Sequence, residues 1–165
     1  MNQNVMENAP MIDVVSVHGA DQLQSIRRLF REYSELVSAA LFFQGFEEEL
    51  AGLPGKYAPP EGLLLLARDE GFDAGCVALK RLDASSAEMK RLYVRNAYRG
   101  AGLGRRLTQM VIDKAGDAGY SRLVLDTMPH LTEAIALYRS LGFRDCAPYL
   151  AAPTPGALCF ELRLS

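Results

Sequence analysis

Three glycines within five residues separate a strand-like run from a helix-like run in the second half of the chain. Gly100, Gly102 and Gly104 follow the apolar run 87–94 and lie just before or at the start of residues 103–119, whose apolar positions recur at helical spacing. Glycine leaves bare backbone at the start of that helix, where several N–H groups can point at one anion. The segment therefore predicts a strand–loop–helix unit that binds a phosphate group.

Two well-known glycine loops fit this segment poorly. A P-loop needs Lys followed by Ser or Thr after its last glycine, but here Arg105 stands at that place. The dinucleotide fingerprint G-x-G-x-x-G fits Gly100 and Gly102, and Asp126 is spaced like a ribose-binding acid, but the third glycine position falls on Arg105. NAD binding stays open as an alternative. The remaining spacing is Arg-x-x-Gly-x-Gly, which begins at Arg99.

The rest of the chain alternates between strand-like runs and amphipathic helical runs. The expected strands are 12–17, 63–69, 74–82, 87–94, 122–127, 143–150 and 156–164, and the expected helices are 21–42, a short one within 44–62, 103–119 and 132–142. Antiparallel hairpins followed by a strand–helix–strand unit predict an α+β fold, with a central mixed, mostly antiparallel sheet of about seven strands flanked by about four helices. We expect one domain over residues 1–165, with the polar segment 1–10 flexible.

Composition narrows the classes of function. The formal net charge of −2 gives no sign of a nucleic-acid partner, and no apolar run is long enough to cross a membrane. The start of the chain lacks the pattern of a signal peptide. Cys76, Cys146 and Cys159 are isolated in apolar surroundings, and the cysteines and histidines show no metal-ligand spacing. We therefore expect a cytoplasmic protein with free thiols and no metal.

Three segments together resemble the GNAT acetyltransferase superfamily. They are AEMKRLYVRNAYRGAGLGRRL, LVLDT and AIALYRSLGF, in this order along the chain. The resemblance implies a GNAT fold and an N-acetyltransferase that uses acetyl-CoA as co-substrate. In this family the Arg-x-x-Gly-x-Gly loop binds the pyrophosphate, and the end of the preceding strand pairs with the pantetheine arm. The implied cofactor residues are Leu92, Tyr93, Val94, Arg99, Gly100, Ala101, Gly102, Leu103, Gly104 and Arg105.

The resemblance also implies catalytic groups. Glu88 corresponds to the carboxylate base of several members, although an ordinary salt bridge with Lys90 or Arg91 is the alternative. The same strand is expected to diverge from its parallel neighbour, and the free backbone N–H of Leu92 is the candidate donor to the thioester oxygen. Tyr138 matches the tyrosine that protonates the departing thiolate, with a core aromatic as the alternative reading.

One position departs from the family pattern. Many members carry Asn seven residues before the tyrosine, where this chain has Leu131, so the Asn contact to the cofactor arm is not carried over. None of the cysteines lies in the motif segments, so direct transfer in a ternary complex is expected rather than an acetyl-enzyme. A non-catalytic acyl-CoA-binding sensor is the alternative from another class, because the loop alone would serve it. Pairing of C-terminal strands, common in the family, leaves a homodimer open.

The acceptor site is the least specified part. The N-terminal helices usually shape it in this superfamily, and we take Phe43, Gln44, Glu47 and Tyr149 as candidate substrate-binding residues. The acidic run 47–49 would attract a cationic amine, although such a run is also typical of a solvated helix face. A peptide, a free amino acid, a polyamine and an aminoglycoside all stay open as acceptors.

Overall fold

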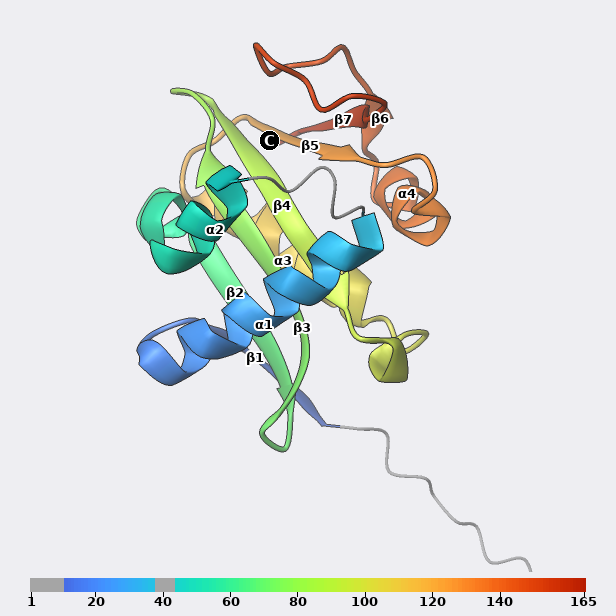
Figure 1. Ribbon diagram of the computed structural model, residues 1–165. Helices are drawn as coiled ribbons and strands as arrows, with labels where there is room; N and C mark the ends of the chain where they lie inside the picture. Colours follow the sequence, from blue (N-terminus) through green and yellow to red (C-terminus); the bar gives the residue numbers. More distant parts are fainter. Residues whose placement is uncertain (1–10, 38–43) are drawn as a thin grey trace, which may run out of the picture.

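The computed structural model describes residues 11–37 and 44–165, which form a sheet with helices on both faces (Figure 1). The strands are β1 Ile12–Ser16, β2 Leu63–Asp69, β3 Phe72–Arg81, β4 Ser86–Val94, β5 Arg122–Thr127, β6 Arg144–Asp145 and β7 Leu158–Arg163. The α-helices are α1 Ala20–Val37, α2 Gln44–Ala51, α3 Leu103–Asp117 and α4 Thr132–Ser140, with 3-10 turns η2 Gly55–Tyr57 and η3 Asn96–Tyr98. For the described residues, this confirms the predicted α+β class and the predicted numbers of strands and helices. The segment expected to be flexible, 1–10, lies outside the described residues.

The strand order is β1-β2-β3-β4-β5-β7-β6, and every neighbouring pair is antiparallel except β4 with β5. That parallel pairing covers only Ser86–Glu88 of β4 and Arg122–Val124 of β5. Within the described residues, no later part of β4 pairs with β5, although β4 continues to Val94 alongside β3. The predicted divergence of the two parallel strands is therefore confirmed.

Strand β4 contains a bulge just after this divergence. Between the pairs that Lys90 and Tyr93 form with β3, two residues of β4 lie opposite one residue of β3. The first of them, Arg91, has a φ of 61°, in the left-handed region that a bulky side chain seldom occupies. Such a conformation costs roughly 1–3 kcal/mol and persists only where the surroundings enforce it. The second, Leu92, packs with the core on the α3 face of the sheet.

Alternation of side chains along the strands divides the core between the two faces of the sheet. In Figure 1, α1 lies in front of the sheet and α3 lies behind it. The α3 face buries residues of five strands against α3 and α4, among them Leu65, Val77, Met89, Leu123, Phe160, Leu107, Val111 and Ile135. The opposite face packs against α1 and α2, with Leu64, Leu66, Ala78, Ile26, Phe30 and Leu50 among the buried residues. The split between β4 and β5 therefore opens between two well-packed layers.

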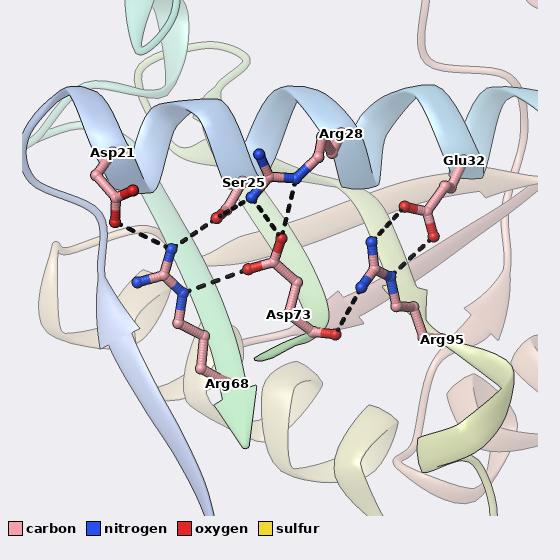
Figure 2. Close-up of polar contacts among 7 residues, drawn as sticks. All are labelled: Asp21, Ser25, Arg28, Glu32, Arg68, Asp73 and Arg95. Atoms are coloured by element: carbon pink, nitrogen blue, oxygen red, sulfur yellow. Dashed lines mark hydrogen bonds and ion pairs between the residues drawn. The ribbon is translucent and has the colours of Figure 1, made fainter. Parts of the chain in front are cut away.

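Charged side chains also fix α1 to the sheet (Figure 2). The carboxylate of Asp73 on β3 is 5% exposed and accepts hydrogen bonds from Arg28 Nη2 at 3.0 Å and Arg68 Nε at 3.3 Å. Both arginines donate to Ser25 Oγ as well, at 3.0 and 2.6 Å. The carboxylate is thus paired on both oxygens, as a buried charge requires.

We expect Asp73→Asn to lower the free energy of unfolding by about 2 kcal/mol at about pH 7, because hydrogen bonds between charged groups are lost. Burial acts to raise the pKa of Asp73, but the hydrogen bonds from Ser25 and Arg28 and the nearby Arg68 outweigh it and hold this pKa below its usual range. The contribution is therefore present above the ordinary carboxyl pKa and disappears as pH falls through the lowered value.

Urea unfolding at about pH 7 and about pH 3 measures both effects, since the wild type should lose its advantage over the variant in acid. Asp113→Asn is the control, because Asp113 is exposed and an amide oxygen can still accept the hydrogen bond from Gln109. Equal stability of wild type and Asp73→Asn at neutral pH would contradict the expected role of the network.

Candidate active site

A cavity of about 540 Å³ lies between the end of β4, the glycine loop and the start of α4. We name it the loop cavity; it is lined by Leu36, Leu92, Tyr93, Val94, Tyr98, Arg99, Gly100, Gly102, Leu103, Gly104, Arg105, His130, Leu131, Thr132, Glu133, Ala134 and Leu137. Every residue predicted to contact the cofactor lines this cavity except Ala101. Segments that are up to a hundred positions apart in the chain are thus brought to one site.

The glycine loop has the geometry that an anion site needs. Gly100 and Gly102 have φ values of 84° and 81°, and Gly102 immediately precedes the first residue of α3. A side chain is disfavoured at both positions. The free N–H groups of the first turn of α3 lie at the positive end of the helix dipole. Arg99 Nε donates to Val94 O at 2.9 Å, and Arg105 Nη2 donates to Ser140 Oγ at 2.6 Å. Two guanidinium groups are therefore held beside the loop, and this arrangement can bind a pyrophosphate.

The two residues before α4 also belong to the loop cavity. Leu131 precedes the helix and makes no side-chain capping hydrogen bond, so it presents an apolar surface to the cavity. His130 Nε2 lies 3.1 Å from Leu36 O at the end of α1. This contact joins the α1 side of the molecule to the segment after β5.

Tyr138, on α4, lies in the core on the α3 face of the sheet. It is 6% exposed, and its ring packs against Phe143 and Phe160 at centroid distances of 5.8 and 6.4 Å. Burial, with smaller effects of Tyr33 and Asp126, raises its pKa far above the usual value. The phenol is therefore protonated at neutral pH, as a proton donor must be, but it does not line either large cavity of the described chain.

Glu88 is 1% exposed, and it forms long ion pairs with Lys80 and with Lys90, the partner that the alternative reading named. Its Oε2 accepts a hydrogen bond of 2.5 Å from the hydroxyl of Tyr149. Its Oε1 lies 3.7 Å from Lys80 Nζ and 3.9 Å from Lys90 Nζ, and within the described chain it has no hydrogen-bond partner. Tyr149 is thus placed against the predicted base, and it does not line the cavity described next.

A second cavity, of about 350 Å³, lies on the α1–α2 side of the split. We name it the charged cavity; its lining residues are Tyr33, Val37, Gly45, Phe46, Glu49, Lys56, Lys90, Arg91, Asp126, Thr127, Met128, Thr154 and Ala157. Sequence reasoning did not assign Lys56, Lys90 or Asp126 to an acceptor site. Only the positions of Lys90 and Asp126 in the sequence could have indicated a role. Lys90 follows Glu88 by two residues, and Asp126 lies near the end of a strand.

The predicted acceptor residues on α2 need a correction. Glu47 is exposed and pairs with Arg31 at 2.7 Å, outside both large cavities. Residues two apart on a helix do not face the same way, so the acidic run 47–49 cannot act as one patch. Gln44 begins α2, and Phe43 lies outside the described residues.

Glu49 enters the charged cavity, but its charge is already balanced. It accepts hydrogen bonds from Arg91 at 2.9 and 3.2 Å and from the Tyr57 hydroxyl at 2.8 Å, and it pairs with Lys56 at 2.7 Å. Burial acts to raise the pKa of Glu49, but Arg91 and Lys56 outweigh it and keep this pKa below its usual range. The Arg91 guanidinium also lies over the ring of Phe46, 5.3 Å from its centroid. These contacts hold Arg91 in its strained conformation.

Among residues 11–37 and 44–165, no group of three or more His, Cys, Asp or Glu side chains is arranged to hold a metal ion. In the same part of the chain, no helix has the length and apolar character needed to cross a membrane.

Comparison with known proteins places these features in a family. The model of the Acetyltransferase (GNAT) family matches residues 23–143. An uncharacterized N-acetyltransferase of Schizosaccharomyces pombe is 39% identical over 156 residues, which cover 93% of this chain and 96% of that protein. An acetyltransferase from Streptococcus agalactiae superposes with a TM-score of 0.81 at 19% identity, covering 93% of this chain and 98% of that one. PaiA N-acetyltransferase from Thermoplasma acidophilum, solved in complex with coenzyme A, gives 0.73 at 17% identity, covering 92% and 98% of the two chains.

Proposed function

Since the chain belongs to the GNAT acetyltransferase family and is an acetyltransferase, we propose that it transfers the acetyl group of acetyl-CoA directly to a primary amine. The observation that carries the proposal is the meeting of two cavities at one point of β4. Lys90 and Arg91 line the charged cavity, and Leu92 to Val94 line the loop cavity. An amine in the first cavity and a thioester in the second would therefore approach each other through the split beside β4.

The loop cavity would hold acetyl-CoA. The glycine loop, Arg99 and Arg105 would bind the pyrophosphate, and the edge of β4 that has no β5 partner would pair with the pantetheine arm. The N–H of Leu92 would donate to the thioester oxygen, where negative charge develops during attack. The coenzyme A complex of the Thermoplasma acidophilum relative supports this use of the fold.

Glu88 would take the proton of the amine through a water molecule. Its Oε1 is buried without a hydrogen-bond partner among the described residues, and such an oxygen is costly unless a donor reaches it. The ammonium groups of Lys80 and Lys90 lie 3.7 and 3.9 Å from this oxygen. Tyr138 would return a proton to the thiolate of coenzyme A, a role taken from the family resemblance, since its burial outside both large cavities raises its pKa and makes it a weaker acid.

The thiols favour direct transfer over an acetyl-enzyme. Burial raises the pKa of Cys76, and likewise the pKa values of Cys146 and Cys159, so none is predisposed to form the nucleophilic thiolate. None of the three lines the loop cavity or the charged cavity. Free thiols suit a reducing compartment, and we place the reaction in the cytoplasm.

Titration of acetyl-CoA, coenzyme A and NAD, each followed by thermal unfolding, tests the cofactor assignment. A ligand of the folded state at a hundredfold excess over its Kd stabilises by roughly 2.7 kcal/mol. For a chain of this length we expect the midpoint to rise by roughly 5–10 °C with acetyl-CoA and coenzyme A, and to stay unchanged with NAD. No shift with acetyl-CoA would remove the basis of every catalytic role above. Binding without thiol release for any amine would favour the non-catalytic sensor.

A further inference from the structure

We propose that the charged cavity binds an amine that also carries a carboxylate, which is the charge pattern of a free amino acid. The inference rests on the proposed function, since it names the acceptor class of that reaction. It selects one class among the peptides, amino acids, polyamines and aminoglycosides that the sequence leaves open.

The first argument is the position of two opposite charges across the split. The last pair between the parallel strands is Glu88 with Val124, and Lys90 and Asp126 each lie two residues further along their strands. Since side chains alternate in direction, both point to the α1–α2 face, and both line the charged cavity. Within the described residues they form no ion pair with each other closer than 4.0 Å. A ligand with one ammonium and one carboxylate can therefore bind between them.

The second argument is that the contacts of both groups within the described residues are few and long. The side chain of Lys90 is 20% exposed, has no hydrogen-bond acceptor within the described chain, and lies 3.9 Å from the nearest carboxylate oxygen, on Glu88. Asp126 is half-buried, and its one hydrogen bond among the described residues, from Thr154 Oγ1, is 3.4 Å long. Burial shifts both toward their neutral forms, lowering the pKa of Lys90 and raising the pKa of Asp126. A substrate carboxylate at Lys90 and a substrate ammonium at Asp126 would satisfy both.

The third argument is the net charge of the cavity lining. Three cations, Lys56, Lys90 and Arg91, stand against two carboxylates, Glu49 and Asp126, which leaves one positive charge. An amino acid whose amine has lost its proton carries one negative charge, and so does its acetylated product. The lining thus complements the reactive form of such a substrate. A polyamine would add positive charge to a site that already has an excess.

Size agrees with a small acceptor. At about 350 Å³ the charged cavity is near the lower end of small-molecule pockets, which span roughly 300–1,000 Å³. Apolar side chains at its rim, including Val37, Phe46 and Met128, can contact a hydrophobic substituent. We therefore favour an amino acid with an apolar side chain over a large polycation such as an aminoglycoside.

The experiment compares each standard α-amino acid with its α-carboxamide and with spermidine, by following thiol release from acetyl-CoA. The acid and its amide present the same amine and side chain, and they differ in the negative charge. For the preferred side chain we expect kcat/KM of the acid to exceed that of the amide by at least about tenfold, mostly through KM. Spermidine is expected to be the poorer substrate.

A variant separates recognition from chemistry. Lys90→Met keeps the length of the side chain and removes its charge, and we expect it to lower the preference for acid over amide by about tenfold. If Lys90 acted only by changing Glu88, the substitution would slow the reactions of acid and amide equally and leave the preference unchanged. Lys114→Met, at an exposed position of α3, is the control and should leave the preference as in the wild type.

The outcomes distinguish this inference from the proposed function. If amides or spermidine react as well as the acids, the carboxylate plays no part and the inference is wrong, while the acetyltransferase proposal stands. If acetyl-CoA binds but no carboxylate-bearing amine is acetylated, the inference is also wrong, and release of thiol with any other amine preserves the proposed reaction. An unchanged acid preference in Lys90→Met would remove Lys90 from the site.

Discussion

Acetyl-CoA is expected to bind the Gly102→Glu variant at least about a hundredfold more weakly than the wild type, a loss of about 2.7 kcal/mol or more. The position has a φ of 81°, and a Cβ added there would meet no other atom within 4 Å, so the new side chain would extend into the loop cavity. Its carboxylate would lie at the positive end of α3, where the pyrophosphate is proposed to bind. Calorimetric titration of the folded variant measures the loss.

The fold should survive this substitution. A side chain in the left-handed region costs roughly 1–2 kcal/mol, and the added charge at the start of α3 offsets part of that cost. Gly102→Ala is the matched control, because it has the same backbone strain without the negative charge. We expect it to retain acetyl-CoA affinity within about tenfold of the wild type. Equal affinities of the Ala and Glu variants would show that the loop does not bind a phosphate at this position.

Glu88→Gln is expected to lower kcat by about 10²–10⁴ without weakening acetyl-CoA binding, because the amide cannot accept the proton of the amine. The substitution keeps the shape of the side chain and an oxygen that can accept the hydrogen bond from Tyr149. Single-turnover thiol release at saturating acetyl-CoA measures the chemical step.

A surface carboxylate provides the comparison for this effect. Glu61 is exposed, pairs with Arg81 at 2.8 Å and lies outside both large cavities, so Glu61→Gln should react like the wild type. A kcat for Glu88→Gln within about threefold of the control would exclude Glu88 as the base. Asp126, the other carboxylate near the split, would then be the group to replace next.

Local patterns predicted the parts of the fold that depend on local chemistry. The strands at 63–69 and 122–127 have the expected bounds. The glycine loop could also be found, because bare backbone before a helix serves few purposes. The predicted strand 143–150 is wrong beyond Asp145, since the segment around Pro148 leaves the sheet and carries Tyr149 to Glu88.

The acceptor side could not be predicted, because it depends on irregular backbone and on pairings between distant segments. Nothing in the residues 89–92 reveals that Arg91 adopts a left-handed conformation. Regular alternation would place Lys90 and Arg91 on opposite faces of the sheet, whereas both line one cavity. Likewise, the sequence shows the acidic run on α2 but not that Arg91 neutralises Glu49.

The bulge also decides where acceptor preference can be re-engineered. Arg91 lines the charged cavity and its neighbour Leu92 lines the loop cavity, so one peptide unit borders both proposed halves of the site. A substitution at Arg91 would change the path of β4, and with it the position of the donor to the thioester. Val37, at the end of α1, and Met128, just after β5, line the charged cavity from other elements. Libraries that diversify those two positions can widen the range of amines while leaving the acyl-transfer geometry in place.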